Sequence, residues 1–563
     1  MDANPKRVVL VFLLFVFFVQ VFGQHQVYKK LEYISPKPGS QFIMPMNNIA
    51  LRSADKFGSN SVEKSLLEVK NSKGHKIDGE LKLSDDERTL IFKPKTPYPL
   101  GETIHVELIN GLKTIKGDEI EPLRFCFTVT PKIIENPQNY LKNDFKFDKP
   151  PSKNKQGLNE NETRIMDNDL PEGFPNFQVN LINPSTTDEY YFMTSFDDWG
   201  WFPDTEPFIM ITDIYGTPVY YKKMKSFAYD LKVQPTGFLS YYSYNPGFRH
   251  KVMDSSYQVI DTYKMGNGYG YTDFHEFKLL ENGHAIVMTY DGQLYAMDTV
   301  VPGGDSNAIV MGFVFQELDT NKEVVFQWRS WDHFLITDAR PFVDLTDSVI
   351  DYVHGNAIEI DSDSTLLISC RNMEEITKIN RNTGDIIWRL GGENNQFDFG
   401  EDTLGFSVQH DIRRLPSGHI SLFDNGSKHP DPKFSSALEY ELDEVNMTVN
   451  QISRFRHDPD VLGYVMGNVQ CKPDGSKVVG WGSAYNSVTE FNSIGEIVYE
   501  MEFEAFSYRS YRFPWKTDYF VTDSDSLDFG AIYYLDSLER EILIMNNAGY
   551  DINITSIYNT DSV

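Results

Sequence analysis

The chain has 563 residues, 40% of them hydrophobic, which is enough apolar material for several packed domains. Its 81 acidic residues outnumber its 52 basic residues, so the formal net charge at pH 7 is −29. Such a charge repels nucleic acid and anionic lipid and excludes both as main partners, although a local basic pocket would still bind an anion. Aromatic residues at 14% and few helical periodicities favour β structure.

The N-terminus, "MDANPKRVVLVFLLFVFFVQVFGQ", places Lys6 and Arg7 ahead of an apolar run over residues 8–22, followed by Gly23. This pattern is typical of a secretory signal peptide over residues 1–23, with an uncleaved membrane anchor as the alternative. No later segment has the length and hydropathy of a spanning helix. We therefore expect an exported protein, periplasmic or extracellular, with no membrane span in the mature chain.

Three cysteines, Cys126, Cys370 and Cys471, lie far apart and lack C-x-x-C spacing. This argues against a disulfide framework and leaves open one bridge, between Cys370 and Cys471. Four asparagines lie in N-x-S/T sequons, which matter only in a host that glycosylates them: Asn161, Asn425, Asn446 and Asn553.

Residues 28–130 alternate polar and apolar side chains between Gly, Pro and Asp turns, as in "SLLEVKNSKG" and "LIFKPKTPYPLGETIHVELINGLKTIKG". This pattern predicts a small β-sandwich, similar to the Ig-like modules of bacterial secreted proteins. Residues 131–180 are rich in Asn, Lys, Asp and Pro and have little to bury, so we expect a linker. Residues 517–563 have strand character and form a short extension, either the start of a further module or an added sheet.

Residues 181–516 contain an internal repeat of two alternating hairpin types. One type, as in "TKINRNTGDIIWRL", occurs six times, and the other, as in "FAYDLKVQPTGFLSYYS", lies between its copies. The last position has only "SYRSYRFPW", while an orphan strand, "EYYFMTS", stands at 189–195. A missing strand at one end and a spare strand at the other are typical of propeller closure, so the segment predicts a six-bladed β-propeller.

Three copies of the second hairpin begin with histidine at the same register: His275, His354 and His410. The innermost strands of a propeller line its channel, so equivalent residues of successive blades form a ring, here with Tyr229 and Gly467 at two further positions. Arg371 and His354 are equidistant from their turn and should face each other at the open end of that hairpin. Asn356, two residues after His354, should point to the same sheet face.

Three imidazoles alone would suggest zinc or copper. A guanidinium in the same shell opposes a bound cation, because its charge is fixed. Imidazoles with an arginine and an amide instead suit a tetrahedral oxyanion, so we expect neither a metal nor an organic cofactor. The alternative is that the histidines are ordinary polar residues at the blade mouths.

The propeller segment, roughly residues 170–516, resembles the bacterial arylsulfate sulfotransferases, which do not use the nucleotide sulfate donor. The resemblance rests on "FSVQHDIRRLPSGH", "TDFHEFKLLENGH", "YVHGNAIEID" and "LISCRN". It implies His410 as a nucleophile that carries a sulfuryl group, with His275, His354 and Arg371 around it and Asn356 in substrate binding. The family's cysteine pair near the nucleophile has no counterpart here, and its late hydroxyl contact has only the approximate candidates Ser483 and Ser487.

The resemblance implies transfer from a phenolic sulfate ester to a phenol through a sulfohistidine, with His275 or His354 as acid and base. It also implies a homodimer formed through the sandwich. Two other functions stay open: an exported sulfate or phosphate ester hydrolase, and a non-catalytic propeller that binds anions or glycans. Four aromatic residues are candidates for stacking on an aryl ring: Tyr229, Tyr269, Tyr271 and Trp481.

Overall fold

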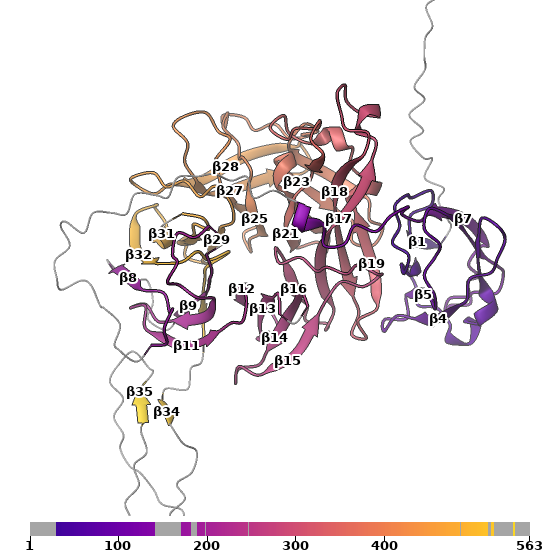
Figure 1. The fold of residues 1–563 in the computed structure, drawn as a ribbon, viewed down its shortest axis with the longest axis horizontal. Coiled ribbons are helices and arrows are strands. Elements are labelled where there is room, and N and C mark those ends of the chain that lie inside the picture. Colours follow the sequence, from indigo (N-terminus) through magenta and orange to yellow (C-terminus); the bar gives the residue numbers. More distant parts are fainter. Residues whose placement is uncertain are drawn as a thin grey trace, which may run out of the picture.

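The computed structural model describes residues 30–140, 170–181, 189–515 apart from 198, 246 and 485, and the short stretches 520–522 and 544–546. Within these residues every regular element is a β-strand or a short 3₁₀ helix, so the protein is all-β, as its composition predicted (Figure 1). The predicted signal peptide and most of the predicted linker and C-terminal extension lie outside the described residues. No described helix is long and apolar enough to cross a bilayer.

The N-terminal unit consists of two antiparallel sheets around one apolar core. Alternation of apolar and polar side chains along its strands turns one face of each sheet inward, with Val69, Phe92 and Val106 among the buried residues. The first sheet has the order β1 (Leu31–Ser35), β2 (Ile49–Ser53), β5 (Thr89–Pro94) and β4 (Gly79–Leu83). The second has β3 (Leu67–Asn71), β6 (Thr103–Leu108) and β7 (Leu123–Thr128), and the short helices are η1 (Ser59–Ser61) and η2 (Lys64–Leu66).

The rest of the described chain contains six further sheets of four or five strands, which follow in chain order, and one two-stranded pair. The first is β33 (Tyr511–Pro514), β9 (Glu189–Ser195), β10 (Phe208–Thr212) and β11 (Pro218–Lys223). The second is β12 (Ala228–Val233), β13 (Leu239–Ser243), β14 (Arg249–Met253) and β15 (Val259–Tyr263). The third is β16 (Phe277–Leu279), β17 (Ala285–Tyr295), β18 (Ala308–Leu318) and β19 (Val324–Arg329), with β20 (Val349–Asp351) added in parallel to β18.

The fourth sheet is β21 (Gly355–Ile360), β22 (Leu366–Cys370), β23 (Glu375–Ile379) and β24 (Ile386–Gly391). The fifth is β25 (His410–Arg414), β26 (Ile420–Asp424), β27 (Ser436–Asp443) and β28 (Thr448–Phe455). The sixth is β29 (Asn468–Cys471), β30 (Lys477–Gly480), β31 (Asn486–Phe491), β32 (Ile497–Phe503) and β8 (Phe177–Leu181). The connections carry η3 (Pro137–Tyr140), η4 (Met297–Thr299), η5 (Ser330–Asp332), η6 (Ile336–Asp338) and η7 (Arg371–Met373), and β34 (Phe520–Thr522) pairs with β35 (Ile544–Asn546).

The two ends of this region meet in shared sheets. The orphan strand β9 pairs with β33 from the C-terminal "SYRSYRFPW", with Phe192 opposite Tyr511, as the spare-strand argument predicted. The strand β8 was expected within the linker, but its "FQVNL" sequence alternates and pairs with β32, burying Phe177. The end of the segment predicted to be a linker therefore contributes an edge strand.

Apolar packing between the sheets is cyclic. Each sheet packs on the next through its own buried cluster. A further cluster joins the sixth sheet to the first, where the Tyr191 and Tyr499 rings stack with centroids 5.0 Å apart. Because each face of these sheets is covered, their strands are apolar on both sides, as in β22 "LLISC", which is buried at every position.

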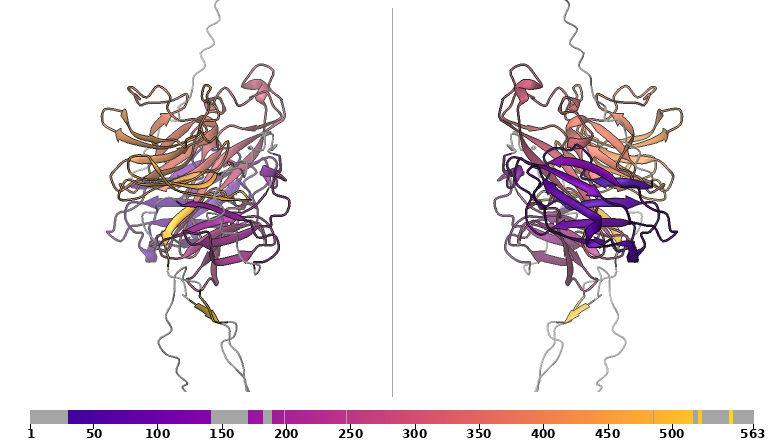
Figure 2. Two further views of the ribbon diagram at one scale, coloured as in Figure 1. Left: turned by 90° about the vertical axis from the view of Figure 1, so that its left-hand side faces the viewer. Right: turned by 90° about the vertical axis from the view of Figure 1, so that its right-hand side faces the viewer.

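The N-terminal unit docks on the third sheet, beside β19 (Figures 1 and 2). The Tyr33 hydroxyl donates to the Gln327 carbonyl at 2.7 Å and accepts from the Gln327 amide at 2.8 Å. His284, which follows the hairpin turn at Gly283, is buried at the same interface. Its Nδ1 lies 2.7 Å from Glu317, and its Nε2 lies 3.2 Å from Asp85 of the N-terminal unit, because the docked sandwich covers this turn.

Candidate active site

The repeated register positions converge on one cavity of about 440 Å³. His275 precedes β16, His354 directly precedes β21, and His410 begins β25, so each stands at the start of the first strand of its sheet. All three line the cavity, as do Arg371 and Tyr229. The imidazole centroids of His275 and His354 are 5.2 Å apart, and their rings are nearly perpendicular.

Arg371 reaches the cavity from the strand that neighbours His354. Its backbone amide donates to the His354 carbonyl at 3.0 Å, and Gly355 pairs with Cys370, so the two residues do lie opposite each other at the open end of the hairpin. The Arg371 side chain is only 6% exposed and donates from Nη1 to the Asn372 side chain at 2.7 Å. These contacts hold a fixed positive charge against the imidazoles.

Each imidazole is held through Nδ1. In His275, Nδ1 lies 2.5 Å from an Asp273 carboxylate oxygen, and in His354 it lies 2.6 Å from Asp351. A carboxylate accepts only, so each Nδ1 carries the proton when the ring is neutral. Nε2 is then the ring nitrogen left to act in the cavity.

His410 differs because its Nδ1 partner is a neutral amide. The Asn425 side-chain oxygen lies 2.7 Å from Nδ1. The Asn425 side-chain nitrogen donates to the carbonyls of Gly463 at 2.8 Å and Met466 at 2.9 Å, which fixes which end of the amide faces the ring. His410 therefore donates from Nδ1 and holds its lone pair on Nε2. The sequon at Asn425 corresponds to a side chain with no exposed surface, which makes it a positioning residue and not a glycan acceptor in the folded protein.

Burial and charge keep His410 neutral. Desolvation, followed by the Arg371 charge, lowers the pKa of His410 well below its usual range. Desolvation also lowers the pKa of His354 and outweighs the opposing effect of Asp351. Burial lowers the pKa of Arg371 too. The cavity thus combines a cation with an uncharged imidazole that carries an unshared electron pair.

Aromatic side chains form most of the rest of the wall. Tyr229 stacks on Phe274 with centroids 4.4 Å apart, and Phe274 stacks on His275 at 4.2 Å. Of the four aromatic candidates from the sequence, Tyr229 and Tyr271 line the cavity, whereas Tyr269 and Trp481 do not. Further lining side chains are Phe196, Trp199, Tyr244, Phe248 and Tyr290. Such rings suit an apolar, planar ligand.

Asn356 does not line the cavity. It is fully buried, and its side-chain nitrogen donates to the Gln409 carbonyl at 2.7 Å. A register shift between Gly355 and Ala357 removes the simple alternation on which the expected direction of Asn356 depended. Asn356 is therefore placed to support the backbone beside His410.

Four further residues of this site were not found from the sequence: Asp273, Asp351, Tyr290 and Tyr508. Tyr508 lies just before β33 and completes the ring of register positions, with its ring centroid 5.5 Å from that of His275. Its hydroxyl lies 3.3 Å from the His275 carbonyl. The two aspartates stand two and three residues before their histidines, a spacing that marks a local hydrogen bond to the following side chain.

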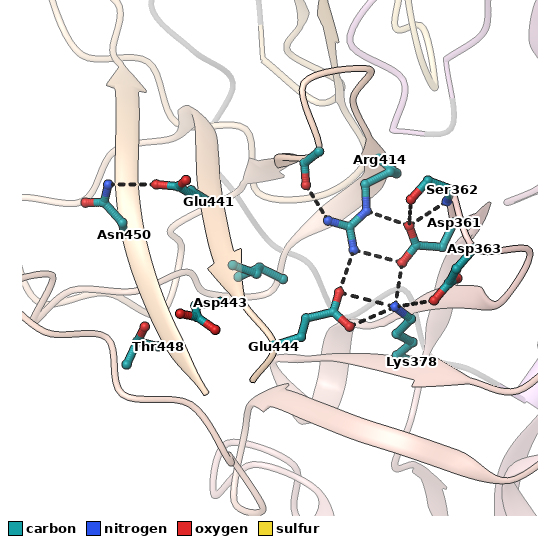
Figure 3. Close-up of a pocket in the computed structure, with 12 residues that line it drawn as sticks. Asp361, Ser362, Asp363, Lys378, Arg414, Glu441, Asp443, Glu444, Thr448 and Asn450 are labelled. Atoms are coloured by element: carbon teal, nitrogen blue, oxygen red, sulfur yellow. Dashed lines mark hydrogen bonds and ion pairs between the residues drawn. The ribbon is translucent and has the colours of Figure 1, made fainter. Parts of the chain in front are cut away.

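A larger hollow of about 680 Å³ lies between the fourth and fifth sheets and shares no lining residue with the histidine cavity (Figure 3). Its cations are matched by carboxylates: Lys378 Nζ lies 3.1 Å from Asp361 and 2.8 Å from Glu444. Arg414 Nε lies 2.7 Å from Asp361. No histidine lines this hollow, so the smaller histidine cavity is the better candidate for chemistry.

Within the described ranges, no three His, Cys, Asp or Glu side chains are grouped so as to hold a metal ion. All three cysteines are free thiols, so Cys370 and Cys471 are not bridged. The histidines meet an arginine and a set of aromatic rings, and this arrangement suits an anionic aryl ester.

The segment that carries most of this cavity matches the model of a known protein family. Residues 243–504 match the model of the arylsulfotransferase (ASST) family. This segment is similar to the arylsulfotransferase family. The match confirms the resemblance seen in the sequence and supports aryl sulfotransferase activity at the level of the family. No curated protein matches the chain.

Similar solved structures include a protein of unknown function from Bacteroides caccae, at 10% identity and a TM-score of 0.36, covering 57% of this chain and 98% of that one. An inactive virginiamycin B lyase from Staphylococcus aureus has 10% identity and a TM-score of 0.30, covering 59% and 89%. A gluconolactonase from Xanthomonas campestris has 8% identity and a TM-score of 0.31, covering 60% and 91%. TM-scores this low carry no functional information for this chain.

Proposed function

We propose that the protein is an arylsulfate sulfotransferase that moves a sulfuryl group from a phenolic sulfate ester to a phenol through a sulfohistidine at His410. The observation that carries the proposal is the neutral His410 ring, oriented by Asn425 and lining the same cavity as Arg371. A nucleophile needs an available electron pair, and a sulfate ester needs a cation for its oxygens. This site offers both.

The proposed architecture is a six-bladed β-propeller whose blades are the six sheets, preceded by an Ig-like sandwich. The pairing of β33 with β9 and the cyclic apolar packing support ring closure. We propose the sandwich over residues 28–130 and the propeller over residues 181–516, with β8 added to the last blade. Residues 1–23 would direct export as a signal peptide, and the sandwich would support a homodimer.

In the first step, the lone pair on His410 Nε2 attacks sulfur in line with the ester oxygen. The new nitrogen–sulfur bond forms as the sulfur–oxygen bond breaks and its electrons leave on the phenolate. Arg371 and His354 would hold the equatorial oxygens of the sulfuryl group, where charge is spread. His275 would protonate the phenolate, and Asp273 would stabilise the imidazolium before that transfer.

In the second step, His275 or His354 would remove the proton from an acceptor phenol. The phenolate oxygen attacks sulfur, the sulfur–nitrogen bond breaks, and its electron pair returns to His410 Nε2. The aryl groups of donor and acceptor would lie in turn against Tyr229 and Phe274. The scheme uses only side chains of this chain, with Arg371 as the fixed charge that a divalent metal supplies in other transferases.

Two other functions make different use of the same residues. In a hydrolase, water would resolve the sulfohistidine, and in a binding protein, no adduct would form. The fully buried Asn425–His410 pair favours chemistry, because anion binding alone does not need an imidazole kept neutral beside an arginine.

The test is incubation of the purified chain with 4-nitrophenyl sulfate, with and without phenol. We expect one sulfuryl group on His410 in the absence of an acceptor, and sulfated phenol with fast release of 4-nitrophenol in its presence. Free sulfate at full rate without phenol would indicate a hydrolase. Absence of both adduct and turnover would indicate a binding protein. Activity that chelation abolishes and a divalent ion restores would show that the imidazoles hold a metal.

A further inference from the structure

The stretch just after the N-terminal sandwich lines the candidate active site, although its composition predicted a linker with little to bury. Asn136 and Asn139 both line the histidine cavity. Between them, η3 begins at Pro137, which is buried. In Figure 1 this violet turn of helix stands beside β17. The chain that leaves the sandwich therefore forms part of the cavity wall.

Contacts with β17 hold this stretch in place. The Thr130 hydroxyl donates to the Gln293 side-chain oxygen at 2.6 Å. At Gly292, the residue before Gln293 in β17, an added Cβ would lie 3.0 Å from Pro137 Cβ and 3.3 Å from Ile134 Cγ2. Only a residue without a side chain lets residues 134–137 approach the strand so closely. Gly292 thus lets this segment pack directly against β17.

The same strand connects the segment to the reacting groups. Tyr290 lies two residues before Gly292 and so faces the same side of β17. Its ring centroid is 6.0 Å from that of His275 and 5.6 Å from that of His354. Asn136 and Asn139 accordingly lie at the β17 side of the cavity, beyond the imidazoles.

The two amides are suited to a polar group on a ligand. Neither makes a side-chain hydrogen bond within the described part of the chain, while Asn139 is exposed and Asn136 is half-buried. An amide both donates and accepts, so it can bind a hydroxyl, a carbonyl or a carboxylate. Apart from the sulfuryl-binding groups, the rest of the wall is aromatic or aliphatic, with Val465 and Met466 as the aliphatic side chains. A ligand that fills the cavity would be aromatic in its middle and polar at its far end.

We propose that residues 134–140 form a specificity wall and that Asn136 and Asn139 select aryl substrates that carry a polar substituent remote from the reacting oxygen. The inference rests on the proposed sulfuryl transfer and adds the substrate class to it. A site that pairs with a substrate hydroxyl discriminates against the analogue that lacks it. For neutral, partly exposed amides we expect a preference of roughly tenfold.

The test compares two acceptors that differ only at the far end, 4-phenylphenol and 4,4′-dihydroxybiphenyl, with 4-nitrophenyl sulfate as donor. The variant is Asn136→Gly with Asn139→Ala; glycine is used because Asn136 has a φ of 45°, which disfavours alanine. We expect the wild-type ratio of kcat/KM for the diol over the mono-ol to be roughly tenfold beyond the factor of two from its two equivalent hydroxyls. In the double variant the ratio should fall close to that factor of two.

Two further variants make the outcome specific. Gly292→Ala keeps both amides but displaces the segment, and should lower the ratio in the same direction. Asn60→Ala changes an exposed asparagine elsewhere on the N-terminal unit and should keep the wild-type ratio. An unchanged ratio in the double variant, or a wild-type ratio of only about two, would overturn the proposal.

Calorimetric binding of the two biphenyls separates this proposal from the proposed function. If wild type turns over neither acceptor, the transferase assignment fails, but the binding ratio still measures selection by the amides. Stronger binding of the diol to wild type, lost in the double variant, supports the specificity wall. Equal binding of both compounds to wild type overturns it.

Discussion

Two neighbouring regions, the histidine cavity and a buried cluster of ion pairs, are built from residues that are adjacent in the sequence but differ in how their charges are paired. Tyr229, His275, His410 and Tyr508 belong to the cavity or its aromatic wall. The residue after each of them is charged and enters a buried ion-pair cage, made of Asp230, Lys232, Glu276, Asp411, Arg413 and Arg509. In the cage three carboxylates meet three cations, whereas in the cavity Arg371 faces imidazoles, of which His410 is kept neutral.

Bulges explain how adjacent residues reach different regions. The pairing register shifts between Tyr229 and Lys232 and again between His410 and Arg413. Asp230 and Asp411, inside these bulges, have φ values of 58° and 61°, which ordinary strand residues avoid. The cage cations hold those two residues, with Arg509 Nη1 3.2 Å from Asp230 and Arg509 Nε 3.2 Å from Asp411. The comparison teaches that one region pairs its carboxylates with cations and supports the fold, while the other places Arg371 beside imidazoles and suits an anion.

The largest expected effect is on the cavity side. His410→Asn removes the attacking nitrogen, so kcat should fall on the order of 10⁴-fold or more, with loss of the covalent adduct. Thermal unfolding should change little, because the cage is intact. The matched control is His419→Asn, the same exchange at a half-buried histidine that bonds Glu439. An adduct that persists in His410→Asn would disprove the assignment.

The cage should show the reverse pattern. Arg509→Met leaves Asp230, Glu276 and Asp411 without one cation, and breaking a buried pair in this way costs about 3–5 kcal/mol of unfolding free energy. Urea unfolding measures this loss. Arg124→Met, at a side chain that is 80% exposed, should leave the free energy of unfolding almost unchanged. If Arg509→Met keeps wild-type stability but abolishes turnover, the two regions are not separate in function.

Asn425 tests how the cavity obtains a neutral nucleophile. Asn425→Ala removes the acceptor for His410 Nδ1, so the ring can rotate or exchange its tautomer, and kcat should fall on the order of 10²–10⁴-fold. The KM for 4-nitrophenyl sulfate should change much less, because Arg371 remains. Asn450→Ala, at an exposed asparagine bonded to Glu441, is the control. A purely structural role would instead lower stability without this separation of kcat from KM.

Only some residues of the histidine cavity could be predicted from the sequence. The three histidines were found because identical hairpins repeat their register, and Arg371 was found by counting across a turn. The same count across the turn at Gly418 places Asn425 near His410, but Asn425 was interpreted only as a sequon. Tyr508 was missed because its strand, β33, has no hairpin partner next to it in the chain and pairs instead with β9.

Other parts of the molecule could not be predicted from repeats. The cage forms between sheets, with Glu276 and Arg413 separated by more than 100 residues and joined at 2.9 Å, so neither local pattern nor turn chemistry indicates it. The docking of residues 134–140 on Gly292 likewise depends on a missing side chain in a strand of another unit. Asn356 was misplaced because a bulge is invisible to simple alternation. Periodicity predicts what repeats, and these contacts do not repeat.

The pH dependence of kcat/KM should show that His410 is neutral in the folded protein. Because burial and Arg371 lower the pKa of His410, the nucleophile stays neutral below pH 6.5, and the acid limb of kcat/KM should lie below that value. The same shift means that His410 lowers stability as pH falls below 6.5, since the unfolded chain binds the proton more readily. In Arg371→Met the His410 titration, followed by NMR, should move upward. A His410 that titrates at or above 6.5 in wild type would contradict the neutral nucleophile.

The smallest effect is expected where the N-terminal unit docks, because the His284–Asp85 pair there is more exposed than the ion pairs of the cage. Burial lowers the pKa of His284, but the hydrogen bonds and charges of Glu317 and Asp85 outweigh it, so the net shift is upward. A raised pKa means that the charged ring stabilises docking fully below pH 6.5 and that this contribution is lost as pH rises through the folded value.

Asp85→Asn should therefore lower the free energy of unfolding by up to about 1 kcal/mol at pH 6 and by nearly nothing at pH 9. Lys93→Met removes a second pair across the same interface, with Glu323 at 3.0 Å. This pair contains no histidine, so we expect the cost of Lys93→Met to be the same at both pH values. Urea unfolding of both variants at the two pH values measures the difference, and an Asp85→Asn cost that is the same at pH 6 and pH 9 would show that His284 is not the titrating group that joins the two units.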